Sequence, residues 1–562
     1  MKTGALMLTS GRSTPRGPGI AYTVLAGIMA LMVGVLALNA NQAPPPQIAE
    51  FAPQSIEQIK KAPNEQGSDF GLFGSGNGAQ DQGLAGGGSI LASPTPPPVD
   101  VPRLRRCYKQ SDGRQTQTED PQSPPCVAYF DPNKSDNGGA TSFGVTRDEI
   151  TVAWPGTIEK ARDTQDLVTF FNSRFEFYGR KIVLQPYGPQ GGVFGPVDAS
   201  TMQSDADYVY QQFAPFASLA YIPKAGVDHY YYDRLAREPH GIVSINSHAT
   251  SDMEQHFQQF SPYEWSYLPS YDLLMRNYAE FICKSLAGRP PSHAGVGISG
   301  NTTPRVFGIV KMIVADNSSP DSAVLRSALN DGCGVRPAVD VAMSDPKDVI
   351  SKFKIAGVTT VICLCQAGHY FNDLMPEATN EVFFPEWLVS SFHYLDYDSA
   401  GQKYPNEHAD HIFGITFHNK WLPQKDMLWY QAIKEVDPEY ETGDDGFSST
   451  SYERYYELLA LSSGIQMAGP HLTPETFAQG MTKAGFPASG SGNDPLYYPG
   501  GGFSANDHSM VDDASMIWWS KNDEGYTTNV RVGTFCYVDH GKRYGLGQWP
   551  SGDQPFFQGS CK

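Results

Sequence analysis

The chain has 562 residues, of which 40% are hydrophobic and 12% aromatic, so it is long enough for two or three domains with a large core. Its 60 acidic residues against 41 basic ones give a formal net charge of -19 at pH 7. This balance argues against a nucleic-acid-binding protein, because phosphates require a basic face.

An uncharged, mostly apolar run near the N-terminus, over residues 19–40, matches the thickness of a bilayer core. Basic residues precede it, which predicts a cytoplasmic segment over residues 1–18 and an exported remainder. Two interpretations stay open, a retained transmembrane signal anchor and a cleaved signal peptide. The length of the run favours the anchor, because the apolar region of a signal peptide is usually shorter.

Residues 41–100 are rich in proline and glycine, with Pro94–Pro98 and Gly86–Gly88 as the clearest pieces. Such a composition buries too little apolar surface to offset chain entropy. We therefore expect a disordered linker between the apolar run and the folded part, which begins near Cys107.

The folded part begins with alternating strands and helices, which predict a mostly parallel sheet with helices on both faces. The expected elements are strands at 150–154, 181–185 and 241–246, with helices at 164–178 and 205–216 between them. A second set follows, with a helix at 273–286, a strand at 305–311 and a helix at 321–330.

The next predicted strand, Val358–Cys365, has no polar face, which indicates a parallel strand covered on both sides. The loop Gln366–Tyr370 leaves its carboxyl end, the edge at which open α/β sheets bind ligands. Beyond it we expect a strand at 411–416 and a long helix at 451–467. Thr473 is then predicted as the N-cap of a last helix that begins at Pro474.

Eight cysteines are consistent with an oxidising compartment. Their placement near turns and loops favours three disulfides, Cys107–Cys126, Cys283–Cys333 and Cys536–Cys561. Cys363 and Cys365 lie on the same side of one strand, and we expect two buried free thiols there in preference to a local bridge. Their spacing does not suit a metal site.

Several motifs, in this order and spacing, resemble the exported actinobacterial-like branch of the type I periplasmic binding proteins. These are the substrate-binding subunits of branched-chain amino-acid-type ABC importers. The motifs are Asp136–Thr141, Gly144–Val152, Cys283, Gly288–Pro290, Pro304–Ile309, Gly357–Thr360 and Phe384–Trp387.

The resemblance covers about residues 107–490 and implies two α/β lobes joined by a hinge. The expected first lobe spans 101–270 and the second 271–410. Residues 411–562 would complete both lobes and end in a disulfide-bearing tail.

The resemblance also implies a function, the capture of a small polar ligand between the lobes, outside the cytoplasm, for delivery to an ABC permease. By position, the ligand-binding residues would be Trp154, Thr157, Ser247 and Thr250 in the first lobe and Tyr271, Gln366, His369, Tyr370 and His393 in the second. The amino-acid binders have a carboxylate in the loop that matches Ser390–Tyr394. Here His393 is central and Asp396 is the nearest acid, which argues against leucine-like ligands.

No catalytic constellation, cofactor motif or metal site is predicted, so we do not expect an enzyme. His408 and His411 are interpreted as part of a surface loop, because no third ligand is spaced with them. A different class of function stays open, a membrane-tethered structural or signalling ectodomain that kept the fold without transport. The predicted anchor and the long linker favour that alternative.

Overall fold

A computed structural model describes residues 107–561 of the chain, except 111–112, 157–160, 190–197, 221–227, 247–251, 299–302, 314–320, 367, 442–448, 486–498, 526–531 and 560. All described residues belong to one compact unit, Leu72–Lys562. The predicted apolar helix at 19–40 and the linker at 41–100 lie outside the described residues. Within the described part, no helix is both long and apolar enough to cross a membrane.

The first lobe is built on a five-stranded, wholly parallel sheet in the order β4-β3-β5-β6-β7. Its strands are β3 (Glu149–Pro155), β4 (Lys181–Tyr187), β5 (Ala217–Leu219), β6 (Val243–Asn246) and β7 (Glu264–Ser266). The three predicted strands of this lobe are thus present. The structure adds the two short strands β5 and β7, which three residues are too few to reveal as a pattern.

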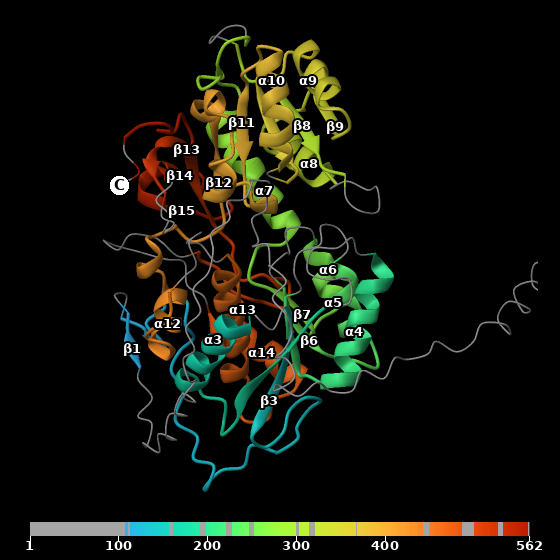
Figure 1. The fold of residues 1–562 in the computed structure, drawn as a ribbon, viewed down its shortest axis with the longest axis vertical. Coiled ribbons are helices and arrows are strands. Elements are labelled where there is room, and N and C mark those ends of the chain that lie inside the picture. The colour runs from blue at the N-terminus through green and yellow to red at the C-terminus, as the bar shows by residue number, and fades with distance from the viewer. Residues whose placement is uncertain are drawn as a thin grey trace, which may run out of the picture. The chain divides into compact units, whose positions relative to one another are not determined.

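Successive side chains of β3 point to opposite faces of the sheet, and each face packs against its own hydrophobic core. Ile150, Val152 and Trp154 pack into the core that contains α3 (Ala161–Arg174) and α13 (Ser449–Ala468). Ala153 points the other way, into the core with helices α4 (Ala199–Phe213) and α5 (His229–Ala236). Figure 1 shows α4 and α5 on one side of β3 and β6, with α3 and α13 on the other.

The second lobe is built on a larger sheet in the order β14-β13-β12-β11-β10-β8-β9. Five parallel strands run from β12 to the edge strand β9, and β13 and β14 continue the sheet antiparallel on the other side, with β15 paired to β13. The strands are β8 (Phe307–Lys311), β9 (Val339–Ala342), β10 (Thr360–Leu364), β11 (Glu386–Val389), β12 (Ile412–Thr416), β13 (Ala514–Glu524), β14 (Val532–Tyr537) and β15 (Arg543–Tyr544). The helices of this lobe include α7 (Tyr271–Phe281), α8 (Ala323–Cys333), α9 (Pro346–Ile355) and α10 (Met375–Asn380).

The chain passes between the two lobes three times. It crosses first between β7 and α7, at residues 267–270, and again between β12 and α12 (Leu428–Val436). Helices α12, α13 and α14 (Pro474–Ala484) pack with α3 and the first-lobe core. The third crossing then leads from α14 to β13, so the C-terminal part of the chain contributes to both lobes.

Three of the sequence landmarks meet at a buried ion pair in the second lobe. The guanidinium of Arg305 donates from Nε to Oε2 of Glu386 at 2.7 Å and from Nη2 to Oε1 at 2.8 Å. The hydroxyl of Thr360 donates to Oε2 at 2.6 Å. The three residues begin or precede the neighbouring strands β8, β10 and β11, so this bidentate pair ties the amino ends of three strands together.

Four disulfides join the eight cysteines, and the three predicted pairs are all present. The fourth joins Cys363 to Cys365, so the prediction of two free thiols is wrong. The reason is local, because β10 ends at Leu364 and Cys365 lies in the bend beyond it. That bend brings the two Cα atoms to 5.1 Å, within the range of a disulfide.

Gly144 allows the entry to the first lobe to pass close to the end of α4. Its φ is +67°, and a Cβ there would lie 1.9 Å from the backbone nitrogen of Phe216. We expect Gly144→Ala to destabilise the protein by more than about 3 kcal/mol, because backbone atoms must move. Gly139→Ala is the matched control, since φ is +64° and nothing lies within 4 Å. It should cost only about 1–2 kcal/mol of backbone strain. Equal urea midpoints for both variants would contradict the prediction.

Candidate functional site

The order in which the chain adds strands to the first-lobe sheet reverses between β3 and β5. In chain order its strands run 2-1-3-4-5, so the connections leaving β3 and β5 go to opposite faces. Open α/β sheets bind ligands in the crevice at such a point, outside the carboxyl ends of the strands. The five parallel strands of the second lobe have the same order, and there the reversal lies between β8 and β10.

Trp154 lies at the carboxyl end of β3, at the edge where the strand order of the first sheet reverses. Its ring is buried and covers Gly156, where a Cβ would lie 2.4 Å from the indole. The backbone N–H of Gly156 donates to the carbonyl of Tyr187 at 2.9 Å, which holds the loop against β4. The strand end therefore presents a fixed aromatic side chain.

Helix α13 brings two oppositely charged side chains to the same edge. Arg454 and Glu457, one helical turn apart and both buried, form an ion pair. Glu457 Oε2 also accepts the backbone N–H of Ala220, the first residue after β5, at 3.2 Å. The Arg454 guanidinium carbon lies 5.9 Å from the centre of the Trp154 ring. We call Trp154, Tyr267, Glu453, Arg454 and Glu457 the switch-point cluster.

Three donor atoms of the switch-point cluster are buried without a hydrogen-bond partner among the described residues. They are Trp154 Nε1, Tyr267 Oη and Arg454 Nε, all of them N–H or O–H groups. Leaving such a group unsatisfied costs about 1–3 kcal/mol, so native proteins rarely do so without a reason. A ligand with acceptor atoms would satisfy these donors.

Glu453 occupies the side of α13 that contacts the second lobe. Hydrogen bonds join its carboxyl group to Tyr394 and Tyr397, in the loop after β11. Burial raises the pKa of Glu453 to about 8, with Arg454 opposing and Glu457 adding to the shift. The group is therefore mostly protonated at pH 7, and the charges of Arg454 and Glu457 balance, so the switch-point cluster is close to neutral.

Asp396, the acid nearest to the expected second-lobe site, contacts three polar side chains of the same lobe. Its Oδ2 accepts from Ser391 at 2.6 Å and Thr416 at 2.5 Å, and lies 2.9 Å from Nδ1 of His418. Burial alone would raise the pKa of Asp396, but His418 and these hydrogen bonds hold it below its usual value. Asp396 thus ties the loop after β11 to the crossing that follows β12.

Of the nine residues predicted to bind ligand, Thr157, Ser247 and Thr250 lie outside the described residues. Gln366 is half-buried directly after β10, at the point where the strand order of the second sheet reverses. The backbone of His369 begins a π-helical turn, His369–Leu374. The predicted role of Gln366 and His369 in ligand binding therefore stays a proposal.

Of the other predicted ligand-binding residues, Tyr271 and Tyr370 form hydrogen bonds within the protein. The hydroxyl of Tyr271 donates to the carbonyl of Asp321 at 2.6 Å. Tyr370 is wholly buried, with its hydroxyl 3.1 Å from the Leu388 carbonyl, so it packs in the core. Burial lowers the pKa of His393 to about 4, so His393 is neutral at pH 7 and offers no positive charge to an anion.

His408 is a core residue and does not lie in a surface loop as predicted. Trp387 Nε1 donates to its Nδ1 at 3.0 Å, and its Nε2 lies 2.9 Å from the Thr379 hydroxyl. Both ring nitrogens thus have protein partners, which leaves neither for a metal. The short turn Asn406–His411 folds His408 back under the second-lobe sheet.

Glu453, Arg454 and Glu457 are not among the residues predicted from the sequence. Helix α13 is buried on every side along most of its length, so it lacks the polar stripe that tells a solvent face from a core face. Three charged residues within one otherwise apolar and aromatic helical stretch were the available signal. Buried charges are almost always paired or functional.

A small cavity lies where the three crossings meet. It is lined by Gln122, Tyr267, Leu268, Phe417, Asn419, Tyr452, Tyr456, Pro499, Met510 and Val511. The space open to the centre of a water-sized sphere is about 10 Å³, room for one water molecule and not for a solute. Gln122 Oε1, which has no other partner among the described residues, is a suitable acceptor for such a water.

No family model matches the sequence, and no curated protein matches it either. Solved structures do match. A substrate-binding protein of an ABC transporter from Aeropyrum pernix aligns with a TM-score of 0.51 and 12% identity, over 71% of this chain and 97% of that one. A fatty acid ABC transporter substrate-binding protein from Thermomonospora curvata aligns with a TM-score of 0.48 and 15% identity, over 75% of this chain and 99% of that one.

The first of these likenesses shows the fold. It agrees with the two sheets of matching strand order and the three crossings of the described chain. The chain therefore has the mixed α/β, two-lobed fold of the type I periplasmic binding proteins, the fold that the sequence resemblance predicts.

Proposed function

We propose that this protein binds a small solute outside the cytoplasm, at the switch-point cluster and the facing loop ends of the second lobe, and presents it to an ABC permease. The observation that carries the proposal is the set of buried, unpartnered donors on Trp154, Tyr267 and Arg454. They gather where a parallel sheet of this strand order binds its ligands. The predicted apolar helix at 19–40 would supply export and a membrane tether.

The chemistry of the cluster also bears on the ligand. The donors favour a solute with hydrogen-bond acceptors, and the Trp154 ring and the surrounding tyrosines favour an apolar or planar part. The near-neutral cluster and the neutral His393 give no net charge for recognition. A ligand without a strong net charge is therefore the best match.

The test is a thermal-shift screen of the full chain, in detergent, against amino acids, amides, sugars and aromatic acids. A ligand present at 100 times its Kd stabilises the folded state by about 2.7 kcal/mol, so we expect at least one class to raise the melting temperature. A screen in which no solute raises it would overturn the proposal. The tethered structural or signalling ectodomain would then be the better interpretation.

The variant Trp154→Phe locates the site once a ligand is known. It removes the indole N–H but keeps an aromatic ring, and we expect affinity to fall about tenfold by calorimetry, the value of one hydrogen bond. The matched control is Trp429→Phe in α12, which removes an equally buried and unpartnered indole N–H. Equal affinities in the two variants would place the site elsewhere.

A further inference from the structure

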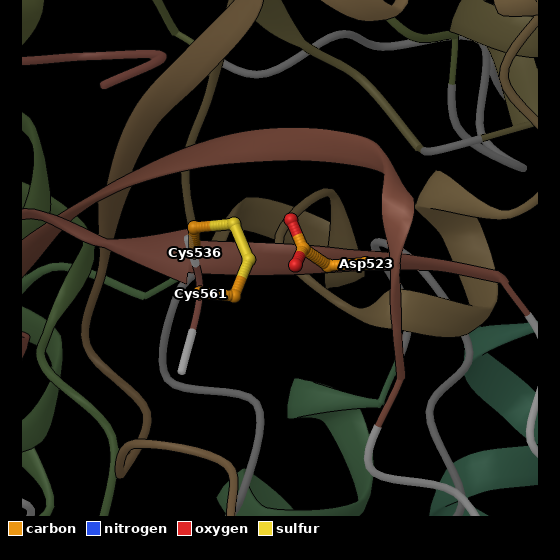
Figure 2. Close-up of side chains that lie close together, drawn as sticks. All are labelled: Asp523, Cys536 and Cys561. Carbon is orange, nitrogen blue, oxygen red and sulfur yellow. A yellow bond between two sulfur atoms is a disulfide. The ribbon is translucent and has the colours of Figure 1, made fainter. Parts of the chain in front are cut away.

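Two groups of side chains in the described residues have the composition of a metal site, but one of them is unable to bind a metal. Asp523, Cys536 and Cys561 lie together, but the two sulfurs form a disulfide, as Figure 2 shows. A disulfide has no thiolate to offer a metal. The second group, Asp233, His256 and Glu264, has no such obstacle.

The second group joins three elements of the first lobe. Asp233 lies in the second turn of α5, His256 in α6 (Glu254–Gln259), and Glu264 is the first residue of β7. Nε2 of His256 is 3.0 Å from Oδ1 of Asp233 and 3.4 Å from Oε2 of Glu264. The ligand atoms of all three residues lie within 4.8 Å of one another.

The two separations from the histidine nitrogen are close to those of a tetrahedral metal site. Zinc bonds to imidazole nitrogen and carboxylate oxygen are about 2.0–2.2 Å long, which at the tetrahedral angle separates two ligand atoms by about 3.3–3.5 Å. The two separations from His256 Nε2, 3.0 and 3.4 Å, lie close to that value. One imidazole and two carboxylates would leave the fourth position to water.

A protonated histidine satisfies this arrangement poorly. Nε2 can donate one hydrogen, and two carboxylates compete for it. Glu264 is 98% buried, its relative exposure being 2%, and its Oε1 has no hydrogen-bond partner. His256 Nε2 and Asp233 Oδ1 are likewise buried without a hydrogen bond of good geometry. A divalent cation would bind all three groups at once.

The surroundings of the group are rich in carboxyl groups. Asp252 interacts electrostatically with Asp228, Asp233, His256 and Glu264, so four acidic side chains lie around the histidine. Arg237 is the basic neighbour, with Nη2 3.7 Å from Oδ2 of Asp233. His256 and Asp233 are partly exposed, at 23% and 16% of their side chains, so an ion can enter from solvent.

We propose that Asp233, His256 and Glu264 bind one divalent transition-metal ion, with zinc as the best match to a mixed nitrogen and oxygen set. The ion would join α5, α6 and β7 beside the proposed ligand site. α5 begins just after the connection that leaves β5, and α6 just after the one that leaves β6 and carries Ser247 and Thr250. The metal would therefore fix the far ends of two connections that the proposed site uses, although metal binding itself does not depend on the ligand.

The test is calorimetric titration of the full chain with ZnCl2 after EDTA treatment and dialysis. The buffer must be free of reductant, because reduction would release Cys536 and Cys561 as competing zinc ligands beside Asp523. We expect one equivalent of zinc to bind and the melting temperature to fall when EDTA removes it. A chain that binds no zinc would overturn the proposal and leave an ion triad in its place.

Three isosteric or near-isosteric variants assign the site, Asp233→Asn, His256→Gln and Glu264→Gln. Each should weaken zinc binding by at least about tenfold. The matched control is His240→Gln, which removes a buried histidine whose Nε2 is 2.8 Å from Asp207 but which has no third ligand. It should bind zinc as the wild type does. If Glu264→Gln fails to fold, Asp233→Asn still decides, and unchanged affinity in that variant would overturn the assignment.

Discussion

Replacing Arg454 by methionine should destabilise the first lobe more than any other single change in the switch-point cluster. The substitution keeps most of the side-chain volume but removes the cation from beside Glu457, in a place closed to solvent. Removing one partner of a buried ion pair typically costs about 3–5 kcal/mol, because the remaining charge stays buried without a counter-charge. The readout is the midpoint of urea unfolding of the full chain.

The double variant Arg454→Met/Glu457→Gln separates charge from packing. If the cost comes from the buried charge, the double variant should recover most of the lost stability. The control is Lys521→Met, which breaks an exposed pair with Asp410 at 2.8 Å and should cost less than about 1 kcal/mol. A double variant as unstable as Arg454→Met alone would show that the packing of the guanidinium matters more than its charge.

Glu453→Gln should change how stability depends on pH. Burial raises the pKa of Glu453 from 4.5 to about 8 in the folded state, so folding favours the protonated form. The stability that this proton supplies is complete below pH 4.5 and is lost as the pH rises through about 8. The whole shift is worth at most roughly 5 kcal/mol, since one pKa unit corresponds to about 1.4 kcal/mol.

Glutamine resembles the protonated acid and does not titrate. We therefore expect Glu453→Gln to match the wild type near pH 4 and to exceed its stability by several kcal/mol near pH 9, measured by urea unfolding across the pH range. Glu439→Gln, at an exposed position, should follow the wild-type curve throughout. Parallel curves for wild type and Glu453→Gln would mean that Glu453 does not take up a proton on folding.

The elements with a strong local pattern were predictable from the sequence. Val358–Cys365 has no polar face and is the central strand β10, and Thr473 with Pro474 starts α14 through a capping box. The three disulfides Cys107–Cys126, Cys283–Cys333 and Cys536–Cys561 were also found. Hydrophobic periodicity and capping are properties of neighbouring residues, so a single sequence contains them.

Other features depend on contacts between residues that are distant in the sequence, and no local pattern predicts them. Tyr370 and His408 are core residues because β10, β11 and the turn before β12 enclose them, which no local pattern indicates. Arg454 meets Trp154, 300 positions earlier, only because the third strand of the first lobe lies beside the first and α13 returns to cover both. Asp233, His256 and Glu264 likewise converge only when α5, α6 and β7 pack together. The sequence by itself thus determined strands β3, β4, β6, β8, β10 and β12, the start of α14 and the mostly parallel α/β class, since these follow from short-range periodicity and capping. The tertiary structure alone decided which buried polar groups face one another, because that depends on strand order and on the three crossings of the chain.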